Sequence, residues 1–172
     1  MVQRARPPAP VRPAAERLEL WGGVECTVNR VGDQWFDQTP RTGHEHRIGD
    51  LDLFADLGVT SLRYPALWER ISPGRPEDRD FRWTDERLAR IYDLGMNPIL
   101  TLCHHGSGPS WTSLVEDSFA PGLAVHAAAV AQRYPWVRGW TPVNEILTTA
   151  RFSALYGYWY PHTQDGCSGP PC

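Results

Sequence analysis

Strand-like and helix-like apolar patterns alternate along this chain of 172 residues. Apolar side chains recur at three-residue steps over 48–57 and 88–94, the spacing of one helix face, and a glycine follows each run. Each predicted helix leads into a β-branched or apolar run, 59–64 and 96–104. This alternation predicts a parallel sheet with right-handed crossovers, so the expected fold class is α/β.

Two more segments bring the pattern to about four β/α units. The apolar run 18–24 predicts a first strand, and an Ala-rich helix over 123–133 precedes a strand that ends in "WTPVNE" (140–145). No Gly-x-Gly-x-x-Gly turn follows the first strand, which argues against an open nucleotide-binding sheet. Polar residues instead follow all four strand ends: Glu25, Arg63, His104 and Glu145. A TIM (β/α)8 barrel gathers its chemistry there and takes about 250 residues, so we expect its N-terminal half only.

Composition excludes several classes of function. All 17 basic residues are arginine, so neither Schiff-base chemistry nor a Walker-type phosphate loop has its lysine. A net charge of −3 gives no attraction to nucleic acid or to an anionic membrane. The four cysteines form no C-x-x-C pair, which predicts free thiols and no metal. No cofactor is expected, and the lack of a signal peptide or membrane-length stretch predicts a cytoplasmic protein.

The predicted organisation has three parts. Residues 1–17 are expected to be a flexible leader, 18–162 the half barrel, and the Gly- and Pro-rich 163–172 a disordered tail. A half barrel leaves strand edges unpaired, which favours association or aggregation. We therefore expect the isolated chain to be poorly soluble, to dimerise, or to be a piece of something longer.

Four motifs together resemble glycoside hydrolase family 1, the retaining β-glucosidase-like barrels. The stretches "LELWGGVECTVN", "DLGVTSLRYPALWERISP", "NPILTLCHHG" and "WTPVNE" have the order and spacing of that family's first four strands. The chain more closely resembles a divergent bacterial module that is fused ahead of a dTDP-4-dehydrorhamnose reductase-like domain. The resemblance implies a carbohydrate substrate, with a missing C-terminal half barrel or a fused reductase-like domain as further partners.

The resemblance assigns the catalytic position to Glu145, as general acid/base, and the contact with the sugar 2-hydroxyl to Asn144. Retaining hydrolysis needs this acid and a second carboxylate about 5 Å away that attacks the anomeric carbon. In the family the second carboxylate lies on strand seven, which this chain does not reach. Ile146 replaces the family's proline after the acid/base.

The resemblance also implies substrate-binding residues. Arg63 matches the arginine that hydrogen-bonds the nucleophile carboxylate, and His104 matches a sugar-contacting histidine. Asn29 stands where the family has a sugar-binding glutamine, and Glu25 joins the group from its strand end. His105 replaces the family's tryptophan, which questions the usual glucose or galactose specificity.

Two other functions remain open on the sequence. A site with one carboxylate fits a non-catalytic carbohydrate-binding or regulatory module of a nucleotide-sugar (dTDP-rhamnose) biosynthesis protein. The H-x-H spacing of His44 and His46, with His104 as a third ligand, fits a metal-dependent barrel hydrolase less well, because His44 precedes a helix rather than ending a strand.

Eight tryptophans are many for this length and could stack on sugars or fill the core. Trp35, Trp111 and Trp159 are the predicted sugar contacts, because they lie in loops or after strand ends. Trp21 and Trp140 are predicted to pack inside.

Overall fold

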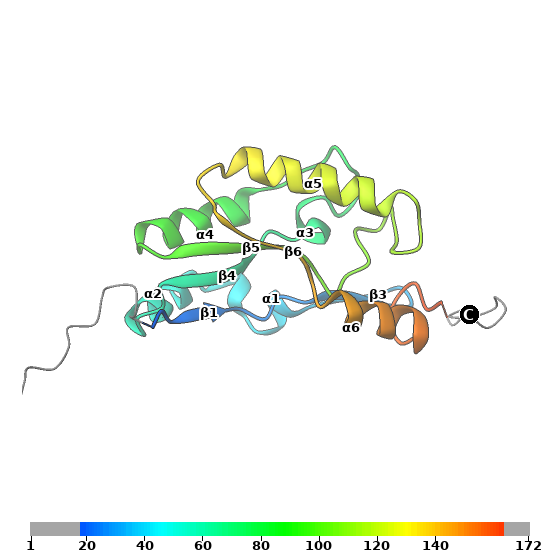
Figure 1. Ribbon diagram of the computed structural model, residues 1–172, viewed down its shortest axis with the longest axis horizontal. Helices are drawn as coiled ribbons and strands as arrows, with labels where there is room; N and C mark the ends of the chain where they lie inside the picture. The colour runs from blue at the N-terminus through cyan, green and yellow to red at the C-terminus, as the bar shows by residue number, and fades with distance from the viewer. Residues whose placement is uncertain (1–17, 164–172) are drawn as a thin grey trace, which may run out of the picture.

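The computed structural model describes residues 18–163, whose centre is a four-stranded parallel sheet (Figure 1). Its order is β1-β4-β5-β6, so each strand lies beside the next strand of the β/α repeat. The strands are β1 (Trp21–Gly23), β4 (Ser61–Pro65), β5 (Asn97–His104) and β6 (Gly139–Asn144). All four predicted strands are present. The leader predicted over 1–17 and the tail from 164 onward lie outside the described residues.

Helices connect the strands, and all of them except the short α3 were predicted from the periodicity. They are α2 (Asp50–Asp56), α3 (Trp68–Ile71), α4 (Arg82–Asp93) and α5 (Phe119–Arg133). Gly58 closes α2 with a φ of 83°, the left-handed conformation that glycine adopts without steric cost. Helices α4 and α5 lie together over the sheet (Figure 1), joined where Arg133 Nε donates to Asp85 at 2.7 Å.

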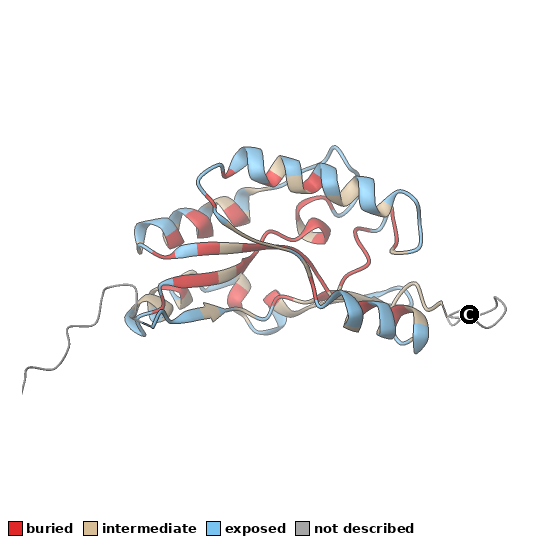
Figure 2. Cartoon of the chain, viewed as in Figure 1, coloured by how far each residue is buried: buried red, intermediate tan, exposed pale blue. Residues whose placement is uncertain are grey.

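The core lies between the sheet and these helices (Figure 2). It is formed by side chains from alternate positions of β4 and β5 and from the inner faces of the helices: Leu51, Leu62, Tyr64, Leu88, Ile91, Leu100, Leu102 and Val130. Trp140 packs against this core as predicted. Trp21 does not, because β1 is an edge strand, and its side chain is 63% exposed. The opposite face of the sheet lines a cavity of 560 Å³ that includes Arg63 and Glu25.

An antiparallel hairpin between β1 and α2 was not predicted. It consists of β2 (Val28–Val31) and β3 (Gln34–Asp37), and Gly32 turns it with a φ of 57°. Two short helices follow it, α1 (Gln38–Arg41) and the 3-10 helix η2 (His44–His46). The hairpin therefore stands at the carboxyl end of β1, beside the predicted site.

The chain after β6 forms α6 (Ile146–Ala150) and the π-helical turn η3 (Arg151–Leu155). It then returns to the hairpin, where the Tyr160 N–H donates to the Arg30 carbonyl at 2.8 Å and the Gly32 N–H donates to His162 Nε2 at 2.8 Å. The segments that follow the first and last strands of the sheet are thus bonded to each other.

Two further observations concern the described residues. Cys26 and Cys103 are buried and unpaired, which confirms free thiols at these two positions. Helices 18 residues long and apolar enough for a lipid bilayer are not found between residues 18 and 163.

The core assignment predicts a large difference between two identical substitutions. Leu100→Ala, at a fully buried position of β5, should lower the free energy of unfolding by about 2 to 5 kcal/mol, because a cavity replaces packed methyl groups. Leu53→Ala, at a side chain of α2 that is 61% exposed, should change it by no more than about 0.5 kcal/mol. Urea unfolding followed by circular dichroism measures both, and equal losses would contradict this core.

Candidate active site

The carboxyl ends of the parallel strands bring three of the predicted site residues together. His104 ends β5, Asn144 ends β6, and Arg63 lies in β4 between β1 and β5. Arg63 Nη1 donates to Asn144 Oδ1 at 2.7 Å, and Arg63 Nη2 donates to His104 Nε2 at 3.3 Å. One guanidinium therefore connects the ends of the two neighbouring strands.

The same network extends to residues that sequence reasoning did not place in the site. His104 Nδ1 lies 2.9 Å from Thr27 Oγ1, Asn144 Nδ2 lies 3.2 Å from His105 Nε2, and His105 Nδ1 lies 3.3 Å from Thr149 Oγ1. Thr27 precedes the hairpin and Thr149 lies in α6, so the network joins every element around the strand ends. His105 carried a sequence signal as a departure from the family pattern, whereas the two threonines carried none.

The hydrogen bonds assign the tautomer of each histidine. Arginine can only donate, so His104 Nε2 accepts from Arg63 and its Nδ1–H donates to Thr27. If the Asn144 amide donates to His105 Nε2, then the Nδ1–H of His105 donates to Thr149. Both imidazoles are then neutral.

The electrostatics agree with neutral rings. Burial, the neighbouring His105 and the Arg63 cation lower the pKa of His104 to about 4, although Glu25 and Glu145 act in the opposite direction. Burial also lowers the pKa of His105, again against the two carboxylates. The pair therefore offers hydrogen-bonding nitrogens at neutral pH rather than positive charge.

Glu25 adds a carboxylate to the wall of this site. Its Oε1 accepts the Thr27 N–H at 2.9 Å, and it lines the cavity on the face of the sheet opposite the core. Burial raises its pKa, but the hydrogen bonds from Thr27 outweigh burial, so the pKa lies below its ordinary value. Glu25 is consequently an ionised acceptor at neutral pH.

Glu145 follows β6 in an unusual backbone conformation. Its φ of 47° and ψ of 59° are left-handed, which is uncommon for a residue with a side chain and is often found at functional sites. Its Oε2 lies 3.7 Å from His105 Nε2, and its side chain is 59% exposed. The carboxyl group therefore stands at the open side of the network.

Asn29 is the predicted site residue that the network does not include. It lies in β2 opposite Phe36 of β3, and no side-chain hydrogen bond joins it to the other site residues within 18–163. The substrate contact predicted for Asn29 stays a prediction.

The predicted sugar-contacting tryptophans separate by position. The Trp159 ring centroid lies 5.4 Å from that of His105, so this indole borders the network. Trp111 instead packs edge-on against Trp68 and donates its Nε1–H to the Ser72 carbonyl at 3.0 Å. Trp35 is exposed on β3, where the Arg30 guanidinium lies 5.7 Å from its ring centre.

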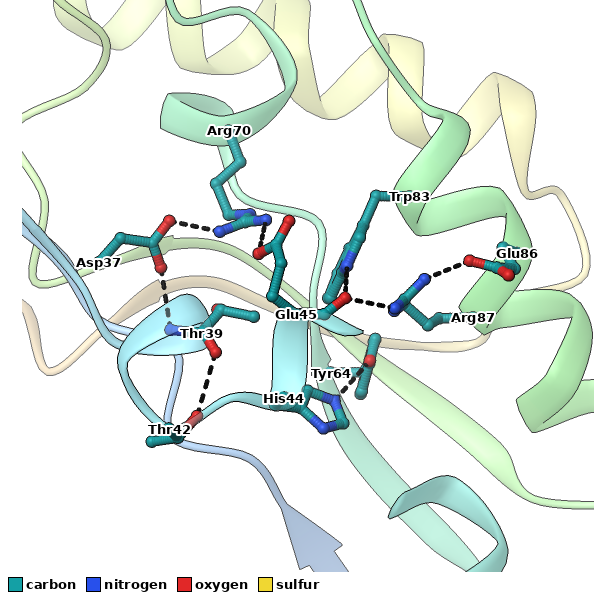
Figure 3. Close-up of polar contacts among 10 residues, drawn as sticks. All are labelled: Asp37, Thr39, Thr42, His44, Glu45, Tyr64, Arg70, Trp83, Glu86 and Arg87. Carbon is teal, nitrogen blue, oxygen red and sulfur yellow. Dashed lines mark hydrogen bonds and ion pairs between the residues drawn. The ribbon is translucent and has the colours of Figure 1, made fainter. Parts of the chain in front are cut away.

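The metal-hydrolase alternative receives no support from the described side chains. His44 Nε2 lies 2.7 Å from the Tyr64 hydroxyl (Figure 3). Its Nδ1 lies 2.8 Å from Asp50 Oδ2, so both ring nitrogens are engaged. Among residues 18–163, no three His, Cys, Asp or Glu side chains gather as metal ligands would.

A cluster of charges beside the site fixes the short helices (Figure 3). Arg70 of α3 donates to Asp37 and, at 2.5 Å, to Glu45 Oε2, while Trp83 donates its indole N–H to the Glu45 carbonyl at 3.1 Å. The Arg70 guanidinium also lies 5.0 Å from the Trp83 ring centre. Hairpin, η2, α3 and α4 are thereby held together.

Comparison with known proteins relates this arrangement to β-glycosidases. Over 67 residues the chain is 43% identical to Beta-glucosidase 47 of Arabidopsis thaliana, a match that covers 36% of this chain and 12% of that protein. The β-glycosidase of Pyrococcus horikoshii matches 89% of the chain with a TM-score of 0.68 and 18% identity. The Thermotoga maritima β-glucosidase in complex with castanospermine matches 71%, with a TM-score of 0.62 and 21% identity.

The chain is a β-glucosidase-like partial barrel. The α/β barrel fold and the resemblance to glycoside hydrolase family 1 are confirmed, whereas fusion to a reductase-like domain remains untested. No protein-family model matches the chain. The β-glucosidase-like partial barrel spans 40% of the Pyrococcus horikoshii structure and 30% of the Thermotoga maritima one.

The network of the β-glucosidase-like partial barrel predicts how His104 responds to loss of its cationic neighbour. Arg63→Met removes a charge that lowers the pKa of His104, so that pKa should rise from about 4 toward the ordinary value of 6.5. Arg47→Met, at an exposed side chain that contacts Asp50 and Thr42, should leave it unchanged. Imidazole NMR titrations measure both, and an unchanged His104 in Arg63→Met would contradict the network.

Proposed function

We propose that this chain carries the acid/base half of an O-glycosyl hydrolase that cleaves a β-linked sugar with retention, and that it acts within a complete barrel. The observation that carries the proposal is the position of Glu145, which stands at the end of β6 beside an Asn144 amide fixed by Arg63 and His105. Retaining hydrolysis needs a carboxylic acid beside a group that orients the sugar.

Asn144 keeps hydrogen-bonding capacity for a substrate. An amide side chain has two N–H donors and two acceptor lone pairs, and the network uses one of each. The remaining N–H and lone pair suit a sugar hydroxyl. Because Arg63 and His105 hold the amide from both sides, the substrate does not have to immobilise it, and such preorganisation favours the transition state.

His105 leaves the Glu145 carboxyl group unengaged. In the assigned tautomer the lone pair of His105 Nε2 accepts from the Asn144 amide, so it is not also an acceptor for Glu145. The 3.7 Å between His105 Nε2 and Glu145 Oε2 is longer than a hydrogen bond, so the carboxyl group is free to turn toward a leaving-group oxygen.

We place the second carboxylate on a part of the barrel that lies outside this chain. The family resemblance places it on strand seven, beside the arginine that corresponds to Arg63. A guanidinium has five N–H donors, and the two hydrogen bonds to Asn144 and His104 leave three for that carboxylate. The same guanidinium would then hold the nucleophile and the sugar-binding amide in one plane.

A carbohydrate-binding or regulatory module is the second candidate function. It is favoured by the 59% exposure of the Glu145 side chain, because a general acid normally works in a site closed to water. The Thermotoga maritima β-glucosidase binds castanospermine and deoxynojirimycin, so these sugar mimics are suitable probes for either function.

The catalytic role predicts a dependence on the leaving group. Glu145→Gln should slow the hydrolysis of an alkyl β-glycoside by about 10²- to 10⁴-fold, because the alkoxide needs a proton as it departs. A dinitrophenyl β-glycoside, whose leaving group needs none, should lose far less. Steady-state rates of the complete barrel that contains this chain on both substrates, together with the matched control Glu77→Gln at an exposed loop glutamate, provide the measurement.

Two outcomes would reject catalysis by Glu145. One is an equal loss on both substrates, which indicates damage to the sugar site rather than loss of an acid. The other is deoxynojirimycin binding without turnover by a complete barrel that contains this chain, and this result would favour the binding module.

A further inference from the structure

Glu69 is a buried carboxyl group that the proposed mechanism does not use. It lies in α3, is 6% exposed, and points its Oε1 at the loop that follows β5. That oxygen accepts the Gly108 N–H at 3.2 Å, and the Cys103 thiol lies 3.8 Å from it. Oε2 is buried and has no hydrogen-bond partner among the described residues.

No cation neutralises Glu69 in the described part of the chain. Arg70, the next residue, turns away to Asp37 and Glu45 (Figure 3). The titratable groups that face Glu69 from other elements are the thiols of Cys103 and Cys26 and the Asp37 carboxylate, so none supplies a positive charge. Burial raises the pKa of Glu69 to about 7, with Asp37 adding to it and the hydrogen bonds from the backbone and Cys103 opposing it.

The loop over Glu69 is shaped to fit this carboxyl group. A Cβ on Gly106 would lie 1.9 Å from Glu69 Oε1 and 2.8 Å from the Val28 carbonyl oxygen, so this position admits no side chain. His105 has a φ of 57° and Gly108 a φ of 79°. A histidine keeps a left-handed backbone conformation only where the surrounding structure stabilises it. The hydrogen bond from the Gly108 N–H to Glu69 is one such stabilising contact.

The loop carries His105 into the candidate site, where it contacts Asn144, Thr149 and Glu145. We propose that Glu69 is a positioning residue: its buried, protonated carboxyl group holds loop 105–108 in the shape that sets His105 against Asn144 and Glu145, and loss of its proton loosens that hold. The structural part of this proposal stands on the described contacts, and its consequence for catalysis rests on the proposed function.

The direction of the pH dependence follows from the raised pKa. A carboxyl group whose pKa is higher in the folded than in the unfolded state stabilises the fold below its unfolded value of 4.5. That stability is lost as the pH rises to about 7, because the folded state then holds a buried charge without a partner. The loop should thus be held most firmly at acidic pH.

Two substitutions separate the charge of Glu69 from its hydrogen bond. Glu69→Gln keeps an acceptor for the Gly108 N–H but cannot ionise, and Glu69→Leu keeps the size but removes the acceptor. The matched control is Glu77→Gln, at an exposed glutamate of the loop before α4. Amide and imidazole NMR spectra of the whole chain between pH 5 and 9 report on the loop without any substrate.

The unmodified chain and Glu77→Gln should show a transition near pH 7 at the amides of Gly106 and Gly108, and Glu69→Gln should lack it. In Glu69→Leu the pKa of His105 should rise toward 6.5, because a released loop exposes the ring. A transition that persists in Glu69→Gln would overturn the proposal. So would unchanged Gly108 and His105 resonances in Glu69→Leu, and if that variant does not fold, Glu69→Gln alone decides.

A pH–rate profile separates this inference from the proposed function. If the complete barrel hydrolyses glycosides, Glu69→Gln should lose less of its kcat across pH 7 than the unmodified protein. If the complete barrel does not hydrolyse glycosides while the amide transition depends on Glu69, the proposed function fails and the positioning role stands.

Stability provides an independent check on the buried charge. The urea midpoint of the unmodified chain should fall between pH 5 and pH 7.5, and Glu69→Gln should flatten that part of the profile. A midpoint that falls equally in both proteins would show that other groups cause the dependence and would contradict a buried, ionisable Glu69.

Discussion

The candidate site depends on one guanidinium. Arg63 lies in the second strand of the sheet and bonds side chains at the ends of the third and fourth, so its charge is shared between an amide and an imidazole. Hydrogen bonds from a charged donor are about twice as strong as neutral ones, and this pair is partly buried. The positions of Asn144 and His104 relative to each other therefore follow from the position of one side chain in β4.

Charge around this guanidinium is arranged in two layers. At the candidate site, the neutral histidines and the ionised Glu25 add hydrogen-bond acceptors around Arg63 and no further cation. Behind it, Arg70 is paired with two carboxylates and Glu69 has none of that compensation. Arg70 and Glu69 are neighbours in one short helix, yet only Arg70 is paired with opposite charges. The reason is that the Arg70 side chain points to the hairpin, whereas that of Glu69 lies beneath the loop.

The strands and the polar residues at their ends could be predicted from the sequence, because a β/α repeat places apolar runs and the polar residues that follow them at regular positions. It did not predict the hairpin, although Val28 and Val31 stand before a Gly32-Asp33 turn that favours one. The helix predicted over 88–94 began too late, because α4 starts at Arg82 and includes Trp83, which stacks 5.7 Å from Tyr64. The helix predicted over 48–57 was instead longer than α2. The role of Glu69 could not be predicted, because it depends on where a loop from another strand passes.

The hydrogen bonds between the hairpin and the segment after η3 connect the two edges of the sheet. They join Arg30 and Gly32, which follow the first strand of the sheet, to Tyr160 and His162, which follow the last. An open sheet would otherwise be free to flatten or to coil further, since only its neighbouring strands restrain it. These hydrogen bonds restrain the distance between the carboxyl ends of the first and last strands within this chain. The remaining strands of a barrel would then have to span a fixed distance between β1 and β6.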